Sequence, residues 1–239
     1  MTLPFDKIYC LHMAEDNERY ELLEKELLRL DIKPQVEIWW TCGRNISRRL
    51  GNAVETLKTP YYWQLSTNNK GVMAGVFNCA FEHYTIVKQA YLRGFNSVLI
   101  MEDDIRFIDN IKHVEKAFNS IPDDYDLIKF WSTDYYLDNN MKFYNGEDNL
   151  YKKIEANGEI PVTSTLCYAL SRNGMKKYID IMDVMFIPAD MPFQCFNPKK
   201  LNIYGMNYKF VFTDNTIKST ITGKLFDDEL KEINGQDNS

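Results

Sequence analysis

Residues 97–107 read SVLIMEDDIRF, an apolar run followed at once by three carboxylates. The first five residues have the length and continuous hydrophobicity of a short strand in a sheet covered on both faces. In open parallel sheets, ligands bind in the crevice beyond the carboxyl ends of the strands. The stretch therefore predicts an α/β fold with a ligand site that begins at Glu102, Asp103 and Asp104.

The three carboxylates would repel one another at a strand end, and a bound cation would relieve that repulsion. A site with oxygen ligands alone favours Mg²⁺ or Mn²⁺ over zinc or copper. Because alternate side chains of an extended segment face the same way, we expect Glu102 and Asp104 to converge and Asp103 to point elsewhere. The triplet alone leaves a second interpretation open, a solvated acidic turn.

The first forty residues predict a β-α-β unit, from which parallel sheets are built. Strands are expected at residues 5–11 and 35–40, with a helix between them that Asp16 or Asn17 can cap. The apolar positions of that helix recur at three- and four-residue steps, at Tyr20, Leu23, Leu27 and Leu30.

Later segments extend this pattern. A helix is expected over residues 76–92, ending at Gly94, and another after Ser171, whose side chain can cap it. Further strands are expected at residues 126–131, 165–170 and 208–212, and irregular segments at 42–72 and 132–163. The result is one doubly wound α/β domain over residues 1–226, followed by a polar, frayed tail over 227–239.

Composition narrows the class of protein. The net charge of −6 argues against a broad electrostatic hold on nucleic acid or anionic lipid. Basic residues gather only locally, at Arg44, Arg48 and Arg49 and at Lys199 and Lys200, where a solvated surface is the simpler interpretation. No apolar run approaches the ~20 residues that a membrane helix needs, and the N-terminus lacks signal-peptide features.

The five cysteines are widely spaced and contain no CxxC pair. This spacing indicates neither a disulfide framework nor a zinc knuckle, and it fits a reducing compartment. We therefore expect a cytoplasmic protein with no nucleic-acid partner and at most peripheral contact with the inner face of a membrane.

Residues 75–107 resemble the signature of glycosyltransferase family 25, the lipopolysaccharide galactosyltransferase group. In that signature a glycine and a cysteine precede a histidine on a helix, and a strand then ends in Glu-Asp-Asp. These first places are filled by Gly75, Cys79 and His83. Residues 9–27 match the family's opening strand, turn and helix, with Arg19 as its arginine, and IPDDYDLIKFW, TSTLCYALSRNGMKKYI and IPADMPF follow in the family's order.

The resemblance implies a GT-A-like fold, a mixed and mainly parallel sheet flanked by helices, with a nucleotide over the N-terminal half. It implies inverting transfer of a hexose, galactose first, from a UDP-sugar to an oligosaccharide or lipid-linked glycan acceptor. The triplet would be a DxD-type motif that holds Mn²⁺ or Mg²⁺, with Asp104 as direct ligand, Glu102 assisting and Asp103 facing the donor sugar. The ion would stabilise the charge that the leaving diphosphate gains.

Inverting transfer also needs a base that activates the acceptor hydroxyl. Asp190, flanked by two prolines, matches the family's downstream aspartate and is the first candidate. A turn-forming or helix-capping role is the alternative for this residue. Asp134 and Asp214 are further candidates for the base.

Other residues are candidates for donor binding. His12, Arg19 and His83 are expected to face the nucleotide or its phosphates, unless His83 is a hydrogen-bonded core histidine and Arg19 forms an exposed helix salt bridge. Two aromatic pairs end predicted strands and could stack on uracil or sugar, with core packing as the alternative: Trp39 and Trp40, and Phe130 and Trp131. Residues 163–168 line the cleft by resemblance.

Other functions remain open. A degenerate transferase-like protein that binds carbohydrate or a partner without catalysis is one, because His12 and Glu82 stand where the family usually has Asn and Ser. An Mg²⁺-dependent nucleotidyltransferase is another, although the chain has neither a GxxxxGK[ST] loop nor a GxGxxG fingerprint. A glycoside hydrolase needs two separated carboxylates without metal, for which the triplet is too crowded. Metal-dependent turnover of a nucleotide-sugar would discriminate among these functions.

Overall fold

The computed structural model describes residues 1–41, 70–133, 140–155, 164–185 and 187–214, together with residues 138, 158 and 216. The strands are β1 (Lys7–Met13), β2 (Val36–Thr41), β3 (Ser97–Glu102), β4 (Ile105–Phe107), β5 (Leu127–Lys129), β6 (Tyr151–Lys153), β7 (Cys167–Ser171), β8 (Ile203–Met206) and β9 (Val211–Thr213). The α-helices are α1 (Asn17–Arg29), α4 (Lys70–Leu92), α5 (Ile111–Asn119) and α7 (Arg172–Met185). Two 3₁₀-helices are η1 (Lys33–Gln35) and η2 (Met191–Cys195).

Seven strands form one sheet in the order β2-β1-β3-β7-β5-β8-β6, and β4 pairs with β9 in a separate two-stranded ribbon. Strands β2, β1, β3, β5 and β8 run in one direction, whereas β7 and β6 run in the other. The expected fold class, a mixed and mainly parallel sheet flanked by helices, is therefore confirmed.

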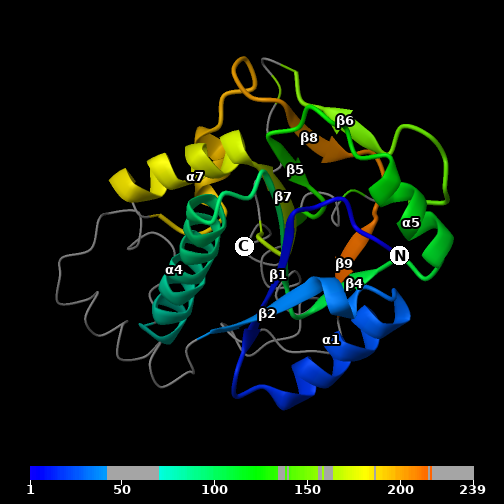
Figure 1. Cartoon of the computed structure of the whole chain (residues 1–239), viewed down its shortest axis with the longest axis horizontal. Helices are drawn as coiled ribbons and strands as arrows, with labels where there is room; N and C mark the ends of the chain where they lie inside the picture. Colours follow the sequence, from blue (N-terminus) through cyan, green and yellow to red (C-terminus); the bar gives the residue numbers. More distant parts are fainter. Residues whose placement is uncertain are drawn as a thin grey trace, which may run out of the picture.

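The helices cover both faces of this sheet (Figure 1). Helices α1 and α5 pack on one face, where Leu23 and Phe118 join a core with Leu99 from β3. Helices α4 and α7 pack on the other face, where Val87 and Met175 join a second core that includes other residues of β3 and β7. No helix in the described ranges is long and apolar enough to cross a membrane.

The order in which the chain adds strands to the sheet reverses at β1, with β2 on one side of it and β3 on the other. Helix α1 leads from β1 to β2 on one side, whereas α4 leads to β3 on the other side of β1 and on the opposite face of the sheet. Such a switch point leaves a crevice beyond the carboxyl ends of the two strands that flank it. The acidic triplet, which follows β3, lies at that end of the sheet.

Local signals explain several element ends. The Asp16 side chain accepts a hydrogen bond from the backbone N–H of Arg19 at 3.4 Å and caps α1. The Ser171 hydroxyl oxygen accepts from the N–H of Gly174 at 3.1 Å at the start of α7. Gly94 has a φ of 84° just after α4, in the left-handed region that glycine favours. All three positions were expected from the sequence.

Other elements differ from expectation. Helix α4 begins at Lys70 rather than near residue 76. The expected strand at 208–212 does not form as one element, because β8 ends at Met206 and β9 begins only at Val211. Helix α5 and strand β4 were not expected, and β6 lies within a segment expected to be irregular. The tail beyond residue 216 lies outside the described residues.

Candidate functional site

The turn between β3 and β4 carries the acidic triplet. Glu102 is the last residue of β3, and Asp103 and Asp104 form the turn. The backbone carbonyl of Asp104 accepts a hydrogen bond from the N–H of Asp214 at 2.8 Å, and the Thr213 hydroxyl donates to Asp104 Oδ2 at 3.2 Å. The triplet is therefore held between the central strand of the sheet and the end of β9.

Asp103 is the most enclosed member of the triplet, with 4% of its surface exposed. His12 Nδ1, from β1, lies 2.7 Å from its Oδ2, and Arg19 Nε, from α1, donates to its Oδ1 at 2.7 Å. Arg19 also pairs with Asp104 Oδ2 at 3.1 Å. Arg19 is itself only 4% exposed, so its interpretation as an exposed helix salt bridge is wrong.

The carboxyl group of Asp104 is buried and lies close to other charges. Burial and the nearby charges of Glu102 and Asp103 raise the pKa of Asp104 from 3.8 to about 6, although Arg19 opposes the shift. Its Oδ1 is buried, and no group in the described part of the chain hydrogen-bonds to it. A carboxylate oxygen left in this state fits a cation, which would supply the missing partner and neutralise the crowded charge.

Glu102 faces a different set of partners. The Thr165 hydroxyl donates to its Oε1 at 2.5 Å, and His83 Nε2 lies 3.4 Å from the same oxygen. Burial alone would raise the pKa of Glu102, but the nearby His83 imidazole, the Thr165 hydroxyl and the charge of Arg19 lower it. Asp103 and Asp104 thus share Arg19, whereas Glu102 faces His83 and Thr165. These contacts do not show the expected convergence of Glu102 and Asp104, which stays a prediction.

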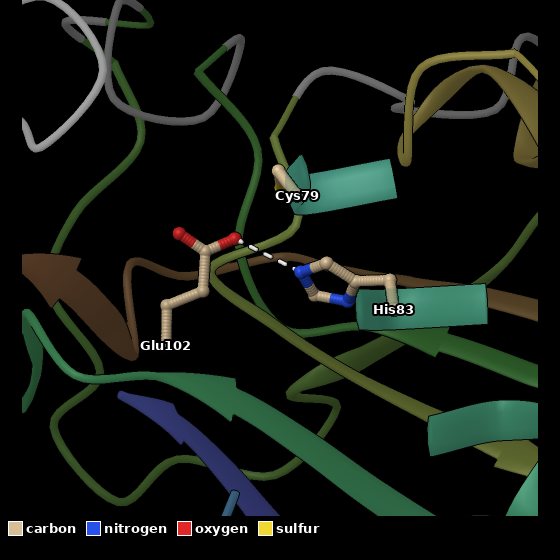
Figure 2. A group of neighbouring side chains, drawn as sticks. All are labelled: Cys79, His83 and Glu102. Atoms are coloured by element: carbon tan, nitrogen blue, oxygen red, sulfur yellow. Dashed lines mark ion pairs between the residues drawn. The ribbon is translucent and has the colours of Figure 1, made fainter. Parts of the chain in front are cut away.

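His83 and Cys79 lie one turn apart on α4 and close to Glu102. Figure 2 shows the imidazole of His83 and the carboxylate of Glu102 pointing toward each other. One ligand atom from each of the three residues lies within 4.8 Å of the others. His83 is fully buried, with Nδ1 2.8 Å from the Tyr168 hydroxyl oxygen, so it is a hydrogen-bonded core histidine that also borders the site. The spacing of Cys79 and His83 was the available sequence signal for this grouping.

Asp190 precedes η2 and remains partly exposed. Its Oδ2 accepts a hydrogen bond from the N–H of Ser164 at 3.2 Å, and it makes no capping hydrogen bond to η2. Asp190 therefore occupies the N-cap position of η2 without a side-chain capping bond, and the Met191 N–H donates to the Pro188 carbonyl at 3.0 Å, which fits the turn-forming alternative. Asp214, the alternative base, is paired with Arg106 at 2.7 Å, and Asp134 lies outside the described residues.

Aromatic side chains lie beside the triplet at the end of β2. Trp40 is 54% exposed; its ring centroid lies 5.3 Å from that of Tyr20 and 5.1 Å from that of His12. Trp39 instead donates its indole N–H to the buried Glu82 at 2.8 Å. The second predicted pair, Phe130 and Trp131, is buried in the core as the alternative interpretation had it.

Several sequence candidates fall elsewhere. Arg44, Arg48, Arg49 and Cys42 lie outside the described residues. Cys10 and Cys167 are fully buried in the core, whereas Cys195 is exposed. Lys200 lines a cavity of about 480 Å³, together with two lysines of α7, Lys176 and Lys177. None of the triplet lines that cavity, so it is separate from the candidate site.

Comparisons with known proteins agree with the resemblance. The chain matches glycosyltransferase family 25 (LPS biosynthesis protein) over residues 5–193. It is 26% identical over 112 residues to a human protein named inactive glycosyltransferase 25 family member 3, a match that covers 45% of this chain and 18% of the human protein. The mouse protein of that name is 26% identical over 108 residues, with 45% and 18% covered.

A solved structure, apo mouse xyloside xylosyltransferase 1, aligns with a TM-score of 0.37 and 10% identity, covering 79% of this chain and 80% of that chain. The curated relatives are matched over less than a fifth of their own length. The family match, by contrast, extends from the start of β1 through the acidic triplet to Asp190 and includes most of the chain. This chain belongs to glycosyltransferase family 25.

Proposed function

We propose that this protein is an inverting, metal-dependent glycosyltransferase that moves a hexose, galactose first, from a UDP-sugar to a surface-glycan acceptor. The observation that carries the proposal is the buried Oδ1 of Asp104, which has no hydrogen-bond partner among the described residues and lies beside the switch point of the sheet. The raised pKa of Asp104 reflects its burial first and then the nearby charges of Glu102 and Asp103. A cation site at this position is what nucleotide-sugar transfer needs.

Asp104 is the direct ligand of Mn²⁺ or Mg²⁺ in this proposal, and Glu102 assists through a bound water or the donor ribose. When bound, the ion stabilises the negative charge that the diphosphate leaving group gains. The sequence led us to expect that Asp103 faces the donor sugar. Its contacts with His12 and Arg19 instead favour a positioning role. Through Asp103, those two residues fix the turn that presents Asp104.

The donor nucleotide would lie over β1 and β2. Trp40 offers an exposed ring there, supported by Tyr20 and His12 behind it. His12 Nε2 is buried, and nothing in the described residues hydrogen-bonds to it, so it has a free position for a donor group. Stacking on an aromatic ring tolerates any base, whereas the histidine nitrogen can add a directional contact.

Asp190 is the proposed base. It accepts the proton of the acceptor hydroxyl while that oxygen bonds to the anomeric carbon and the nucleoside diphosphate leaves with the electrons of the broken bond. Asp190 is partly exposed, and among the described residues its carboxylate accepts one hydrogen bond, from the Ser164 backbone, which leaves it available for this role. Nearby, His83 and Glu102 would border the donor phosphates.

The acceptor class follows from the family description, which names lipopolysaccharide biosynthesis. We propose an oligosaccharide or lipid-linked glycan acceptor, met in the cytoplasm at the inner face of a membrane through peripheral contact. A second candidate function is a non-catalytic carbohydrate- or partner-binding protein. It is favoured by the word "inactive" in the names of the human and mouse relatives.

A nucleotide-sugar panel tests the proposal. The wild-type chain, Asp104→Ala, Asp190→Asn and the exposed-carboxylate control Asp123→Asn are assayed with Mn²⁺, Mg²⁺ or EDTA for donor hydrolysis and transfer. We expect slow, metal-dependent cleavage of one UDP-sugar by wild type and by the control, and none by Asp104→Ala. Asp190→Asn should bind donor but lose transfer. Turnover that is unaffected by EDTA would overturn the metal role, and no turnover with any donor would favour the non-catalytic function.

A further inference from the structure

We propose that Cys79, His83 and Glu102 form a second metal site that takes Zn²⁺ or another borderline-soft divalent cation. Glu102 is the ligand that this site shares with the proposed Mn²⁺ or Mg²⁺ site at Asp104. The other two ligands, a thiolate and an imidazole, lie on α4, whereas Asp104 contacts Arg19 of α1 and Thr213 of β9.

The helix and the sheet together set the geometry. Cys79 and His83 are four residues apart on α4, so their side chains lie on the same face of the helix. Glu102, at the end of β3, faces them across the interface (Figure 2). The three ligand atoms lie within 4.8 Å of one another, and His83 Nε2 and Glu102 Oε1 are 3.4 Å apart. A tetrahedral zinc ion separates its ligand atoms by about 3.3–3.8 Å, so small side-chain rotations close the site.

The second observation is the environment of a buried nitrogen. His83 is fully buried, and its Nε2 makes no well-aligned hydrogen bond within the described part of the chain, although Glu102 Oε1 lies at ion-pair distance, 3.4 Å away. Buried polar atoms in this state are uncommon and call for an explanation. The other ring nitrogen is held by the Tyr168 hydroxyl at 2.8 Å. Metal-binding histidines are typically fixed in this way, with one nitrogen on a hydrogen-bond partner and the other on the ion.

Thr165 contacts two of the three proposed ligands. The Thr165 hydroxyl donates to Glu102 Oε1 at 2.5 Å and lies 3.9 Å from Cys79 Sγ, so it touches two of the three ligands. The sulfur-nitrogen-oxygen donor set selects zinc-like ions, whereas the oxygen set around Asp104 suits Mg²⁺ or Mn²⁺. Three protein ligands leave a fourth position for water or a substrate oxygen.

The shared carboxylate couples the two positions. Because Glu102 cannot serve both ions fully, zinc at this site should compete with an ion held by Glu102 and Asp104; this consequence alone rests on the proposed function. The binding itself does not, and its test therefore uses metal binding as readout rather than sugar transfer.

Cobalt titration of the EDTA-stripped full chain tests the site. We expect wild type to bind one equivalent of Co²⁺ with a thiolate-to-cobalt charge-transfer absorption that Zn²⁺ displaces. Cys79→Ser should lose that absorption, whereas the exposed-thiol control Cys195→Ser should keep it. His83→Gln should weaken Zn²⁺ binding at least 100-fold, and Tyr168→Phe, which removes only the supporting hydroxyl, about 10–100-fold.

A folded wild-type chain without the charge-transfer absorption would overturn the proposal, as would an absorption unchanged by Cys79→Ser. Circular dichroism checks the fold of each variant. If Cys79→Ser fails to fold, alkylation of the wild-type chain with iodoacetamide, read by mass spectrometry, replaces it. Zn²⁺ should then protect Cys79 at least 10-fold while leaving the labelling rate of Cys195 unchanged; equal labelling of Cys79 with and without Zn²⁺ would also overturn the site.

Discussion

Arg19 links two carboxylates of the triplet from inside the protein. It hydrogen-bonds to Asp103 and pairs with Asp104, and the charges of both raise its pKa although burial opposes them. A buried ion pair adds little by itself, but breaking one leaves an uncompensated charge. The turn after β3 therefore depends on a residue of α1 that is far away in sequence.

Replacing Arg19 with alanine should lower the free energy of unfolding by about 3–5 kcal/mol, because Asp103 would remain buried without its countercharge. Urea unfolding of the metal-free chain measures the change. Lys176→Ala is the matched control, since Lys176 pairs with Asp180 on the surface at 2.7 Å and should have a much smaller effect. Equal effects of the two substitutions would show that the buried network does not stabilise the fold.

Asp104→Asn should stabilise the metal-free chain at pH 8 by about 3 kcal/mol. The folded chain holds the pKa of Asp104 at about 6 instead of 3.8, so below about pH 4 the carboxyl is protonated in both states. As pH rises through about 6, the folded carboxyl must ionise against its neighbours, and this part of the stability is lost. Asparagine mimics the protonated form at every pH.

Thermal or urea unfolding at pH 4, 6 and 8 checks this prediction. The stability difference between the variant and wild type should grow from pH 4 to pH 8, while Asp123→Asn, at an exposed position, should show no such trend. The same Asp104 variant should lose Mn²⁺ binding. A stability difference that stays constant across this pH range would contradict a raised pKa of Asp104 in the folded chain.

The sequence named residues that the structure brings together, but not the partners of each. The acidic triplet, His12, Arg19 and His83 were all named from the sequence, and the structure brings them to one end of the sheet. Arg19 lies four residues before Leu23, so helix periodicity places it on the same face as the buried Leu23 and Leu27, and only its charge argued for exposure. The Arg19 side chain is buried together with Asp103, which turns toward α1 and accepts its hydrogen bond.

At the scale of elements, α7 packs against β5 through a close backbone contact. A Cβ at Gly174 would lie 1.9 Å from the carbonyl oxygen of Asp126, a distance that no side-chain rotation can relieve. Asp126 also accepts hydrogen bonds from Ser171 and Asn173, which fix the start of the helix. The first turn of α7 therefore has one permitted position on the sheet.

Gly174→Ala should cost about 3 kcal/mol or more of folding free energy, since either the helix or β5 must shift. Gly94→Ala is the control, because a Cβ there meets no atom within 4 Å and only its φ of 84° opposes alanine. That control should cost about 1 kcal/mol. Chemical denaturation measures both, and a smaller loss for Gly174→Ala than for Gly94→Ala would contradict the packing argument.

Elements with strong periodicity or caps were predictable, and short ones were not. Helix α5 has a capping Asn110 and an apolar stripe at Val114, Ala117 and Phe118, so its signal was present in the sequence. Strands β4 and β6 have three residues each, too few to establish alternation. Pairing with β9 and β8, respectively, decides their conformation.

At the scale of the whole molecule, β1, β2 and α1 assemble the proposed donor surface. A UDP-sugar with Mn²⁺ at 100 times its dissociation constant should stabilise the folded chain by about 2.7 kcal/mol, or about 5–10 °C in Tm. Trp40→Ala should weaken donor binding by about 1–3 kcal/mol and reduce that shift. Leu92→Ala removes an even more exposed apolar side chain elsewhere and should leave the shift unchanged.

Differential scanning fluorimetry with and without donor measures these shifts. A full shift in Trp40→Ala would remove the ring from the donor surface, and a reduced shift in Leu92→Ala would indicate a general loss of stability instead.

The sequence by itself determined the α/β class, the central strand, the acidic triplet after it and the family, because hydrophobic periodicity, caps and motif order are local properties of the chain. The tertiary structure alone decided which neighbour each carboxylate meets. His12 from β1 and Arg19 from α1 reach Asp103, whereas His83 from α4 and Thr165 reach Glu102. The reason is topological. Helices α1 and α4 lie on opposite faces of the sheet on either side of β1, so consecutive carboxylates at the carboxyl end of β3 face different surroundings.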